Sequence, residues 1–248
     1  MKVIIIGGRG TPACIAEQMV RAREDYGMDI EVLGLALDDH SMGDSVNGQP
    51  ILCGIRELHE KYGKYKDVFY VYSLYRSDVL KERVELLYSL NFPLEKFCNF
   101  VYPTVRVSKS AQLGCGNMIL ADSSVGPCVK LGNFNTLLGA HIGHDSVVGN
   151  NNFMASGARI GSCCQVGDMN FFGMVSLLPS SISIGNGNYI GAACCVSRKL
   201  KDNRMLYHTG TKVHPMTVDE LKQDMFSTCR STSSAASFCQ GQEGKDNK

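Results

Sequence analysis

Apolar residues recur at every sixth position through the second half of the chain. Ten successive hexads carry an apolar residue at one phase, and glycine follows it in seven of them. The ten positions are Ile142, Val148, Met154, Ile160, Val166, Phe172, Leu178, Ile184, Ile190 and Val196. This period is typical of hexapeptide β-helices, in which each hexad forms one short strand and a turn. Three hexads close a coil, so residues eighteen apart, such as Ile142 and Ile160, are expected to stack.

The same period begins further upstream and contains one irregular step. The earlier apolar positions are Val107, Leu113, Ile119, Val125, Leu131 and Leu137. The step from Leu137 to Ile142 is five residues instead of six. We therefore predict a parallel β-helix over residues 102–212, with about six coils and a local irregularity that re-aims the nearby His144.

Residues 1–101 alternate short apolar runs with helical patterns. The expected strands are Lys2–Ile6, Ile30–Leu37, Val68–Ser73 and Lys96–Val101, and the expected helices are Pro12–Tyr26, Gly54–Tyr62 and Ser77–Leu90. This alternation predicts a small Rossmann-like α/β domain with a parallel sheet. The segment from Gly43 to Pro50 is expected to be a loop. Residues 213–248 are polar, and we expect one short helix at Thr217–Phe226 followed by a disordered tail.

Composition and charge exclude several classes of protein. The net charge is +1 and no basic run occurs, which argues against nucleic-acid binding. No apolar stretch has the length of a transmembrane helix, and the start of the chain reads as a strand, so we expect a cytoplasmic protein. The eleven cysteines lack the spacing of a zinc or thioredoxin motif, and we expect most of them to be small buried residues.

The turn after the first expected strand is rich in glycine and leads into a helix. Its sequence is Gly7-Gly8-Arg9-Gly10-Thr11, and Asp38-Asp39 follows the second expected strand. Backbone N–H groups at such a turn can bind an anion, and acids at the end of a second strand can bind a ribose. The same residues also fit a structural turn and two solvated acids. The incomplete glycine spacing argues against a dinucleotide.

One histidine in the repeat stands beside an acid, in the segment Gly143-His144-Asp145. Imidazole accepts protons near neutral pH, and a neighbouring carboxylate can orient it. Acyl transfer from a thioester needs such a base. Neighbouring side chains in a β-helix diverge, so contact between the two is not assured, and a solvent-facing polar residue is the alternative. His141 lies beside the segment but has no acidic neighbour.

The start Lys-Val-Ile-Ile-Ile-Gly-Gly, a short α/β region and hexapeptide repeats with Gly-His144-Asp145-Ser-Val-Val-Gly together resemble a known family. They are similar to bacterial sugar acyltransferases of the left-handed β-helix superfamily, which include sialic-acid O-acetyltransferases and UDP-amino-sugar N-acetyltransferases. The resemblance covers residues 1 to about 212. It implies a homotrimer with acetyl-CoA between adjacent β-helices. The charge pattern, with no basic run and no basic amphipathic helix, gives no reason to expect a nucleic-acid or membrane partner.

The resemblance also implies site residues. His144 corresponds to the general base and Asp145 to the acid that assists it. The implied acetyl-CoA contacts are Phe153, Gly173, Met174, Gly191 and Ala192, and the implied sugar-nucleotide contacts are Arg9, Gly10, Thr11, Asp38, Asp39, His40 and Ser73. The chain departs from the family at Arg9, where a histidine is common, and at Phe153, where some members carry a second histidine.

We therefore expect an acetyl-CoA-dependent acetyltransferase that modifies an amine or hydroxyl of a sugar, and we expect this sugar to be nucleotide-linked. Attack is expected to be direct, without an acyl-enzyme, with a backbone N–H of the next coil stabilising the oxyanion. A non-catalytic β-helix scaffold or sugar-nucleotide-binding module is the alternative. A metal-dependent hydratase of the carbonic anhydrase type needs three histidines, and only His141 and His144 lie close in sequence. No metal is expected.

Overall fold

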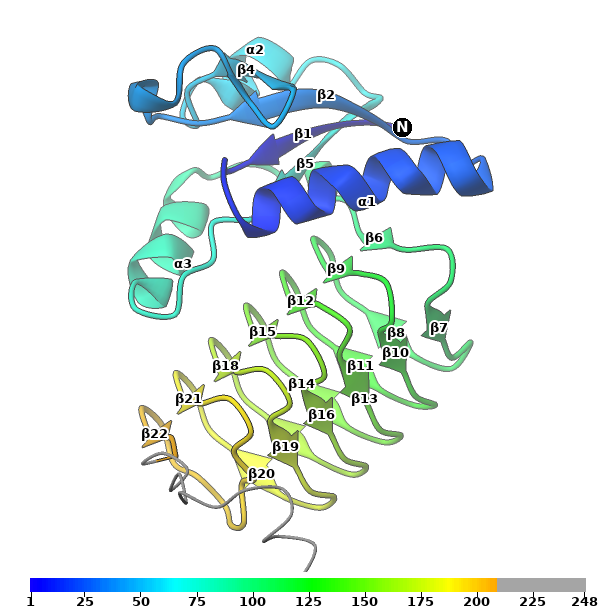
Figure 1. Ribbon diagram of the computed structural model, residues 1–248, viewed down its shortest axis with the longest axis vertical. Helices are drawn as coiled ribbons and strands as arrows, with labels where there is room; N and C mark the ends of the chain where they lie inside the picture. The colour runs from blue at the N-terminus through cyan, green and yellow to red at the C-terminus, as the bar shows by residue number, and fades with distance from the viewer. Residues whose placement is uncertain (209–248) are drawn as a thin grey trace, which may run out of the picture. The chain divides into compact units, whose positions relative to one another are not determined.

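The computed structural model describes residues 1–208, except for the side chain of His40 (Figure 1). The expected helix at 217–226 and the expected disordered tail lie outside the described residues. Met1–His208 forms one continuous unit, in which an α/β layer rests on a β-helix. Among the described helices, none combines the length and the apolar character needed to span a membrane.

The N-terminal sheet has five strands in the order β3-β4-β2-β1-β5. They are β1 (Lys2–Ile6), β2 (Glu31–Ala36), β3 (Ser45–Val46), β4 (Gln49–Cys53) and β5 (Val68–Tyr72). All neighbouring pairs are parallel except the β3–β4 hairpin, which turns at Asn47-Gly48. The sequence pattern predicts a loop here instead of a hairpin. Asn-Gly is a hairpin signal, but the two strands are short and Pro50 lies in one of them.

Helices cover both faces of this sheet, as expected for buried parallel strands. Helix α1 (Thr11–Tyr26) covers one face, and α2 (Leu58–Tyr62) and α3 (Leu80–Ser89) cover the other (Figure 1). Two 3-10 turns, η1 (His40–Met42) and η2 (Leu94–Lys96), complete the layer. Gly7 has φ 137°, and a Cβ there would lie 2.7 Å from Cγ of Pro12, so the tight entry into α1 requires glycine.

The repeat forms a left-handed parallel β-helix, as predicted. Its first face contains β7 (Arg106–Val107), β10 (Ser124–Val125), β13 (His141–Ile142), β16 (Arg159–Ile160) and β19 (Leu177–Leu178). Its second face contains β8 (Gln112–Leu113), β11 (Lys130–Leu131), β14 (Val147–Val148), β17 (Gln165–Val166) and β20 (Ser183–Ile184). Its third face contains β6 (Phe100–Val101), β9 (Met118–Ile119), β12 (Thr136–Leu137), β15 (Phe153–Met154), β18 (Phe171–Phe172), β21 (Tyr189–Ile190) and β22 (Met205–Leu206).

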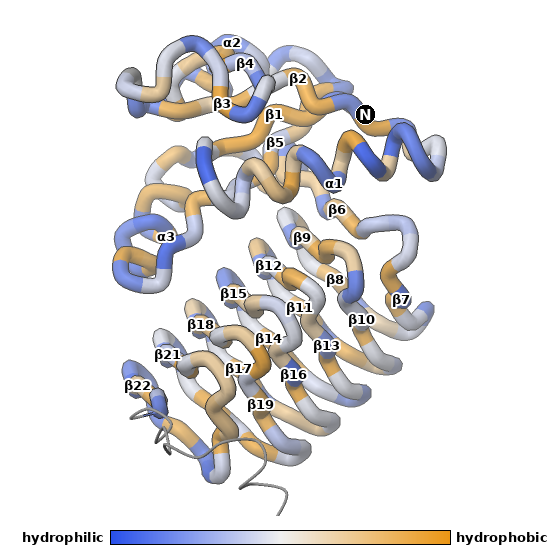
Figure 2. Tube along the Cα trace, viewed as in Figure 1, coloured by the Kyte–Doolittle hydropathy of each residue, from blue (hydrophilic) through white to orange (hydrophobic). Residues whose placement is uncertain are grey.

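The second residue of each hexad strand points into the coil, which confirms the predicted stacking. Ile142 pairs with Ile160, which pairs with Leu178, and all three are at most 3% exposed. Figure 2 shows the resulting alternation of apolar and polar residues along every coil. Glycine follows because successive coils nearly touch at the corners: a Cβ on Gly143 would lie 2.7 Å from the carbonyl carbon of Gly161.

Three corners join the faces, and we number them by the face that they leave. The first corner of the central coil is Gly143–Ser146, the second is 149–152 and the third is 138–140. The irregular step lies in this third corner, which has three residues where the next coil has four, at 155–158. The predicted irregularity at His144 is therefore wrong. Gly139, at φ 59°, absorbs the shortening one corner earlier, and the first corner keeps its regular length.

Buried asparagines form a ladder along the second corner. The side chains of Asn117, Asn135, Asn152, Asn170 and Asn188 are at most 1% exposed. In the first four, Oδ1 accepts the side-chain N–H of the next asparagine at 2.9–3.1 Å and also its backbone N–H. In the last, Asn188, Oδ1 accepts the backbone N–H of Arg204 at 2.9 Å. The ladder thereby satisfies buried corner amides that the short strands leave without partners.

The α/β layer and the β-helix share buried side chains. Met19 of α1 belongs to the same apolar cluster as Met118 of β9. Gln18 Oε1 accepts the N–H of Ala121 at 2.8 Å. The expected last α/β strand at 96–101 divides between the two parts, because Phe97 bridges Tyr70 of β5 whereas Phe100–Val101 forms β6 of the β-helix.

Candidate functional site

His144 and Asp145 lie on the first corner between β13 and β14. The Nδ1 atom of His144 lies 2.7 Å from Oδ2 of Asp145, and the two side chains are 56% and 57% exposed. Asp145 has φ 57°, a left-handed conformation that aspartate tolerates better than most residues. In a regular strand the two side chains diverge. The corner conformation brings them together.

This hydrogen bond decides which imidazole nitrogen is available for chemistry. A carboxylate only accepts, so the bond places the ring proton on Nδ1 and leaves a lone pair on Nε2. Since both side chains are more than half exposed, a substrate can approach Nε2 directly from solvent. The pair therefore has the arrangement of a general base with an orienting acid.

Cysteines occupy the matching left-handed position in the neighbouring coils. Cys128 precedes Asp145 and Cys163 follows it in the stack, with φ 57° and 59°. Both are exposed. Single ligand atoms of His144, Asp145 and Cys163 all lie within 4.8 Å of one another. The sequence analysis missed this neighbour, although Cys163 is eighteen residues after Asp145 and the period predicts that they stack.

The backbone amides of the next coil are already engaged at this corner. Ser162 N–H donates to Ser180 Oγ at 3.0 Å, and Cys163 N–H donates to the carbonyl of His144 at 2.9 Å. Cys164 N–H donates to Ser146 Oγ at 3.0 Å. These three N–H groups are not free to bind an oxyanion. The backbone N–H expected to stabilise the oxyanion is therefore none of these three.

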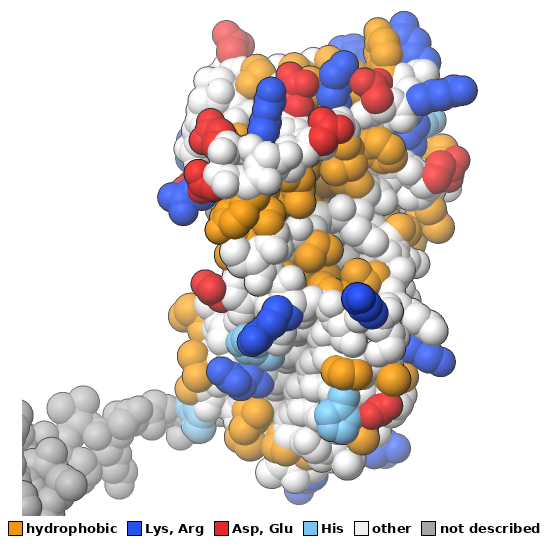
Figure 3. All heavy atoms as spheres, turned by 90° about the vertical axis from the view of Figure 1, so that its right-hand side faces the viewer, with side chains coloured by type: hydrophobic (Ala, Val, Ile, Leu, Met, Phe, Trp, Pro, Cys, Tyr) orange, Lys and Arg blue, Asp and Glu red, His pale blue; other side chains and the backbone are white. Residues whose placement is uncertain are grey.

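His141 lies on the first face and belongs to a different environment. Its Nδ1 lies 2.8 Å from Ser124 Oγ. In the same ladder of outward residues, Arg159 is the adjacent residue on one side, and Arg106 lies beyond Ser124 on the other. Burial, and then the two guanidinium groups, lower its pKa. Figure 3 shows histidine and basic side chains together on this side of the β-helix. The two histidines are therefore not interchangeable.

The α/β layer contains a cavity of about 530 Å³ at the carboxyl ends of β1, β2 and β5. Open parallel sheets bind ligands at this edge. Of the expected sugar-nucleotide residues, Arg9, Asp38, Asp39 and Ser73 line the cavity. Gly10 and Thr11 begin α1 but are not lining residues, and the side chain of His40 lies outside the described part.

Polar groups in this cavity favour an anionic ligand that carries hydroxyl or amide groups. Arg9, Arg76 and Arg83 all line it, and the sequence analysis missed the last two, which follow β5. Helix α1 has no acid in its first turn and no side-chain cap, so its N-terminal N–H groups stay available to an anion. Ser73 is 1% exposed, and its Oγ has no hydrogen-bond partner in the part of the chain that the structure describes. A buried hydroxyl of this kind calls for a partner.

The two acids after β2 already have protein partners. Asp38 Oδ1 accepts the N–H of Ile55 at 2.7 Å. Asp39 Oδ1 accepts the N–H and the Oγ–H of Ser41 at 3.0 and 2.6 Å. Each carboxylate retains further acceptor positions. Asp38 and Asp39 thus stabilise the loop after β2, and this role is compatible with binding a ligand in the cavity.

The expected acetyl-CoA contacts do not lie beside His144 in one chain. Gly173, Met174, Gly191 and Ala192 form the third corner of two later coils, and Phe153 lies on the third face. Phe153 is 8% exposed and packs between Tyr75 and Phe171, at ring-centroid distances of 5.5 Å each. Little of its surface is left for a ligand. Met174, by contrast, is 58% exposed.

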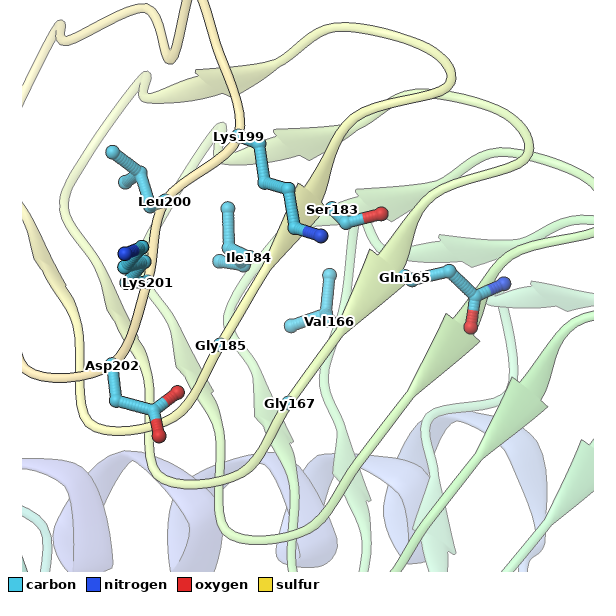
Figure 4. Close-up of a pocket in the computed structure, with 10 residues that line it drawn as sticks. All are labelled: Gln165, Val166, Gly167, Ser183, Ile184, Gly185, Lys199, Leu200, Lys201 and Asp202. Carbon is cyan, nitrogen blue, oxygen red and sulfur yellow. The ribbon is translucent and has the colours of Figure 1, made fainter.

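A second cavity opens on the second face, which begins at the His144 corner. Its volume is about 640 Å³, and it lies where the chain leaves the hexad pattern at 199–202. Figure 4 shows Lys199 extending toward Ser183, with Gln165 on the neighbouring strand. Gln165 in turn pairs with Val147 of the His144 coil. A groove with two lysines, Lys199 and Lys201, therefore continues the second face away from the His144 corner.

No protein-family model matches the sequence, and no curated protein matches it. Solved structures do match the fold. The acetyltransferase domain of PglB from Neisseria gonorrhoeae, in complex with acetyl coenzyme A, is 20% identical, has a TM-score of 0.70, and is matched over 86% of this chain and 98% of that chain.

Two further solved structures match over a similar extent. A histidine-to-asparagine variant of perosamine N-acetyltransferase from Caulobacter crescentus, in complex with CoA and GDP-perosamine, is 21% identical, with a TM-score of 0.70 over 87% of this chain and 98% of that chain. WeeI from Acinetobacter baumannii is 16% identical, with a TM-score of 0.68 over 86% of this chain and 100% of that chain. These likenesses establish a left-handed β-helix joined to an α/β layer.

Proposed function

We propose that the protein is an acetyl-CoA-dependent acetyltransferase that acts on a nucleotide-linked sugar. The observation that carries the proposal is the 2.7 Å contact between His144 and Asp145 on an exposed β-helix corner. The solved structures with this fold support it, because one binds acetyl-CoA and another binds CoA with GDP-perosamine. The latter is an N-acetyltransferase, so amino sugars are the first acceptors to test.

His144 acts on the acceptor in this proposal. Its Nε2 removes a proton from the sugar amine or hydroxyl as the nucleophile attacks the thioester carbonyl. The carbon–sulfur bond then breaks, and the proton passes to the departing CoA thiolate. Asp145 holds the ring and stabilises the imidazolium that forms between these steps.

Transfer is direct in this proposal, and Cys163 makes that statement testable. A thiol near a histidine can act as a nucleophile. Direct transfer predicts that incubation with acetyl-CoA alone leaves the mass of the protein unchanged. An acetyl group found on Cys163 by peptide mass spectrometry, and passed on when sugar is added, contradicts direct transfer.

The α/β cavity is the proposed site for the nucleotide sugar. Arg83 is half-buried and lines the cavity. Arg76 forms an ion pair with Asp78, whereas Arg83 has no ion pair within residues 1–208. The guanidinium groups and the start of α1 fit a diphosphate. Ser73 Oγ, which is buried and unpartnered, fits a hydroxyl or ring nitrogen of the ligand.

The active unit is proposed to be a homotrimer. The His144 corner and the third corner are separate in one chain, so a site that uses both needs two copies. The third corner and the start of the following strand β19 expose apolar side chains: Met174 is 58%, Val175 67% and Leu177 40% exposed. Such a patch favours association with another copy. Light scattering that reports a monomer at micromolar concentration contradicts the shared site.

Two surfaces compete as the place where CoA lies, and paired variants separate them. Met174→Asp disrupts the third corner, whereas Lys199→Ala removes a cation from the groove on the second face. The proposal places CoA against the third corner of a neighbouring copy, so Met174→Asp is expected to raise the KM for acetyl-CoA. A larger increase with Lys199→Ala assigns CoA to the groove instead.

The central experiment mixes the protein with acetyl-CoA and a panel of UDP-, GDP-, CMP- and dTDP-linked sugars. Acetylated product is measured by mass spectrometry, because the eleven cysteines interfere with thiol reagents. His144→Ala is expected to abolish transfer, while the matched control His141→Asn retains it. Loss in the control but not in His144→Ala assigns the base to His141. If the protein binds a sugar nucleotide but transfers acetyl to none of the sugars in the panel, the result favours the non-catalytic scaffold or binding module.

A further inference from the structure

The first corner carries a third side chain with metal-binding chemistry. Among the described residues, His144, Asp145 and Cys163 form the one group of three or more His, Cys, Asp or Glu side chains close enough to hold a metal ion. Their ligand atoms lie within 4.8 Å of one another, and all three residues are exposed. An imidazole, a carboxylate and a thiolate are typical ligands of zinc.

The backbone fixes this group more firmly than its exposure suggests. Asp145 N–H donates to the carbonyl of Pro127, and Cys163 N–H donates to the carbonyl of His144, each at 2.9 Å. The left-handed residues of successive coils are thus held one above another. The side chains remain free to rotate, because none of the three is packed in the core.

A tetrahedral zinc ion requires only a small adjustment. Bond lengths of about 2.0–2.3 Å place the ligand atoms of such a site about 3.3–3.7 Å apart. The nitrogen and oxygen now at 2.7 Å must separate slightly, and the sulfur must move inward by an amount on the order of 1 Å. Rotation of exposed side chains supplies shifts of this size. Three protein ligands leave a fourth position for water.

We propose that His144, Asp145 and Cys163 form a binding site for zinc and similar divalent ions, and that an ion in this site blocks acetyl transfer. Binding itself rests on the geometry alone, whereas inhibition also rests on the proposed function. The ion competes for the imidazole lone pair and for the Asp145 carboxylate, which the base needs. Binding displaces protons from the ligands, so it strengthens as pH rises.

Cobalt(II) tests the site without any activity measurement. It substitutes for zinc, and a bound thiolate produces a near-ultraviolet charge-transfer band. The full chain is titrated with Co²⁺ alone, and zinc is then added to displace it. Cys163→Ser is expected to lose the band, and so is His144→Asn. The matched control is Cys128→Ser, at the same corner position one coil before Asp145 and two coils before Cys163, with a similar left-handed φ. It is expected to keep the band.

The two serine variants also show whether Cys163 or another of the eleven cysteines binds the cobalt ion. Both replace an exposed cysteine at positive φ by a residue of similar size, so the backbone strain is unchanged. Equal bands in Cys163→Ser and the parent protein overturn the site, as does a loss that is equal in both variants. Circular dichroism of each variant shows whether the fold is retained.

Inhibition is measured as acetylated sugar by mass spectrometry, because zinc also binds the thiol of CoA. Each variant is compared with its own zinc-free rate. At zinc concentrations about 100 times the Kd, the rate is expected to fall about 100-fold. Cys163→Ser is expected to need at least about tenfold more zinc, and Cys128→Ser the same amount as the parent.

The test of metal binding and the test of inhibition can fail independently of each other. A cobalt band that depends on Cys163 together with full activity in zinc refutes inhibition but leaves the metal site standing. No acetyl transfer with any acceptor refutes the proposed function, while the cobalt titration still decides the site.

Discussion

Replacing Asp145 by asparagine isolates the role of the charge next to His144. Asparagine keeps the size of the side chain and tolerates the left-handed φ of 57°. It removes the negative charge that accepts the Nδ1 proton at 2.7 Å. Its amide can also donate to Nδ1, which places the ring proton on Nε2 and removes the lone pair needed for base catalysis.

The expected loss of kcat in Asp145→Asn follows from the strength of this hydrogen bond and from the exposure of the two side chains. A hydrogen bond to a charged group contributes about 1.5–3 kcal/mol. Because the side chains are 56% and 57% exposed, water screens the interaction, and we take about 1–2 kcal/mol. That corresponds to a loss of about 5- to 30-fold in kcat. His144→Ala is expected to lose far more, since the base itself is gone.

The assay is steady-state product formation for the parent, Asp145→Asn, Asp145→Ala and His144→Ala. Asp145→Ala additionally places alanine at positive φ, which costs about 1–2 kcal/mol of stability, so its thermal unfolding separates catalytic from folding losses. An unchanged kcat in Asp145→Asn refutes the orienting role. A loss as large as that of His144→Ala shows that Asp145 does more than orient the ring.

Three further predictions test the cavity, the pH response and the ladder. Arg83→Ala is expected to raise the KM for the nucleotide sugar about tenfold, for one lost charge-assisted contact, with kcat unchanged in steady-state kinetics. The folded-state pKa of His141 is lowered, so the unfolded chain binds more protons, and unfolding titrations should show stability falling as pH drops below about 6.5; His141→Asn should weaken this fall. Asn152→Ala leaves the backbone and side-chain N–H of Asn170 without acceptors and should cost about 2–5 kcal/mol in denaturant unfolding.

Much of the fold is readable from the sequence because the repeat is a local pattern. Aliphatic residues six apart, mostly followed by glycine and sustained over many hexads, are typical of a coil that closes after three hexads, so the pattern predicts the stacking of Ile142 on Ile160. Helix α1 was predicted within one residue, from its glycine turn and Pro12.

The missed elements were those decided by pairing partners. Strand β4 forms because its edge meets β2, and Phe100–Val101 joins the β-helix because β9 lies beside it. Arg76 and Arg83 enter the cavity only because the end of β5 and the start of α3 lie next to the turn after β1. No local signal distinguishes these residues from other surface arginines.

The sequence by itself determined that His144 and Asp145 occupy a coil corner, and that Cys163 follows one coil later. Only the tertiary structure decided that their side chains meet. Side-chain direction at a corner depends on the sign of φ, and stacking of successive coils holds Asp145, like Cys128 and Cys163, in the left-handed region. That conformation is a property of the closed coil and its hydrogen bonds between coils, which no single hexad contains.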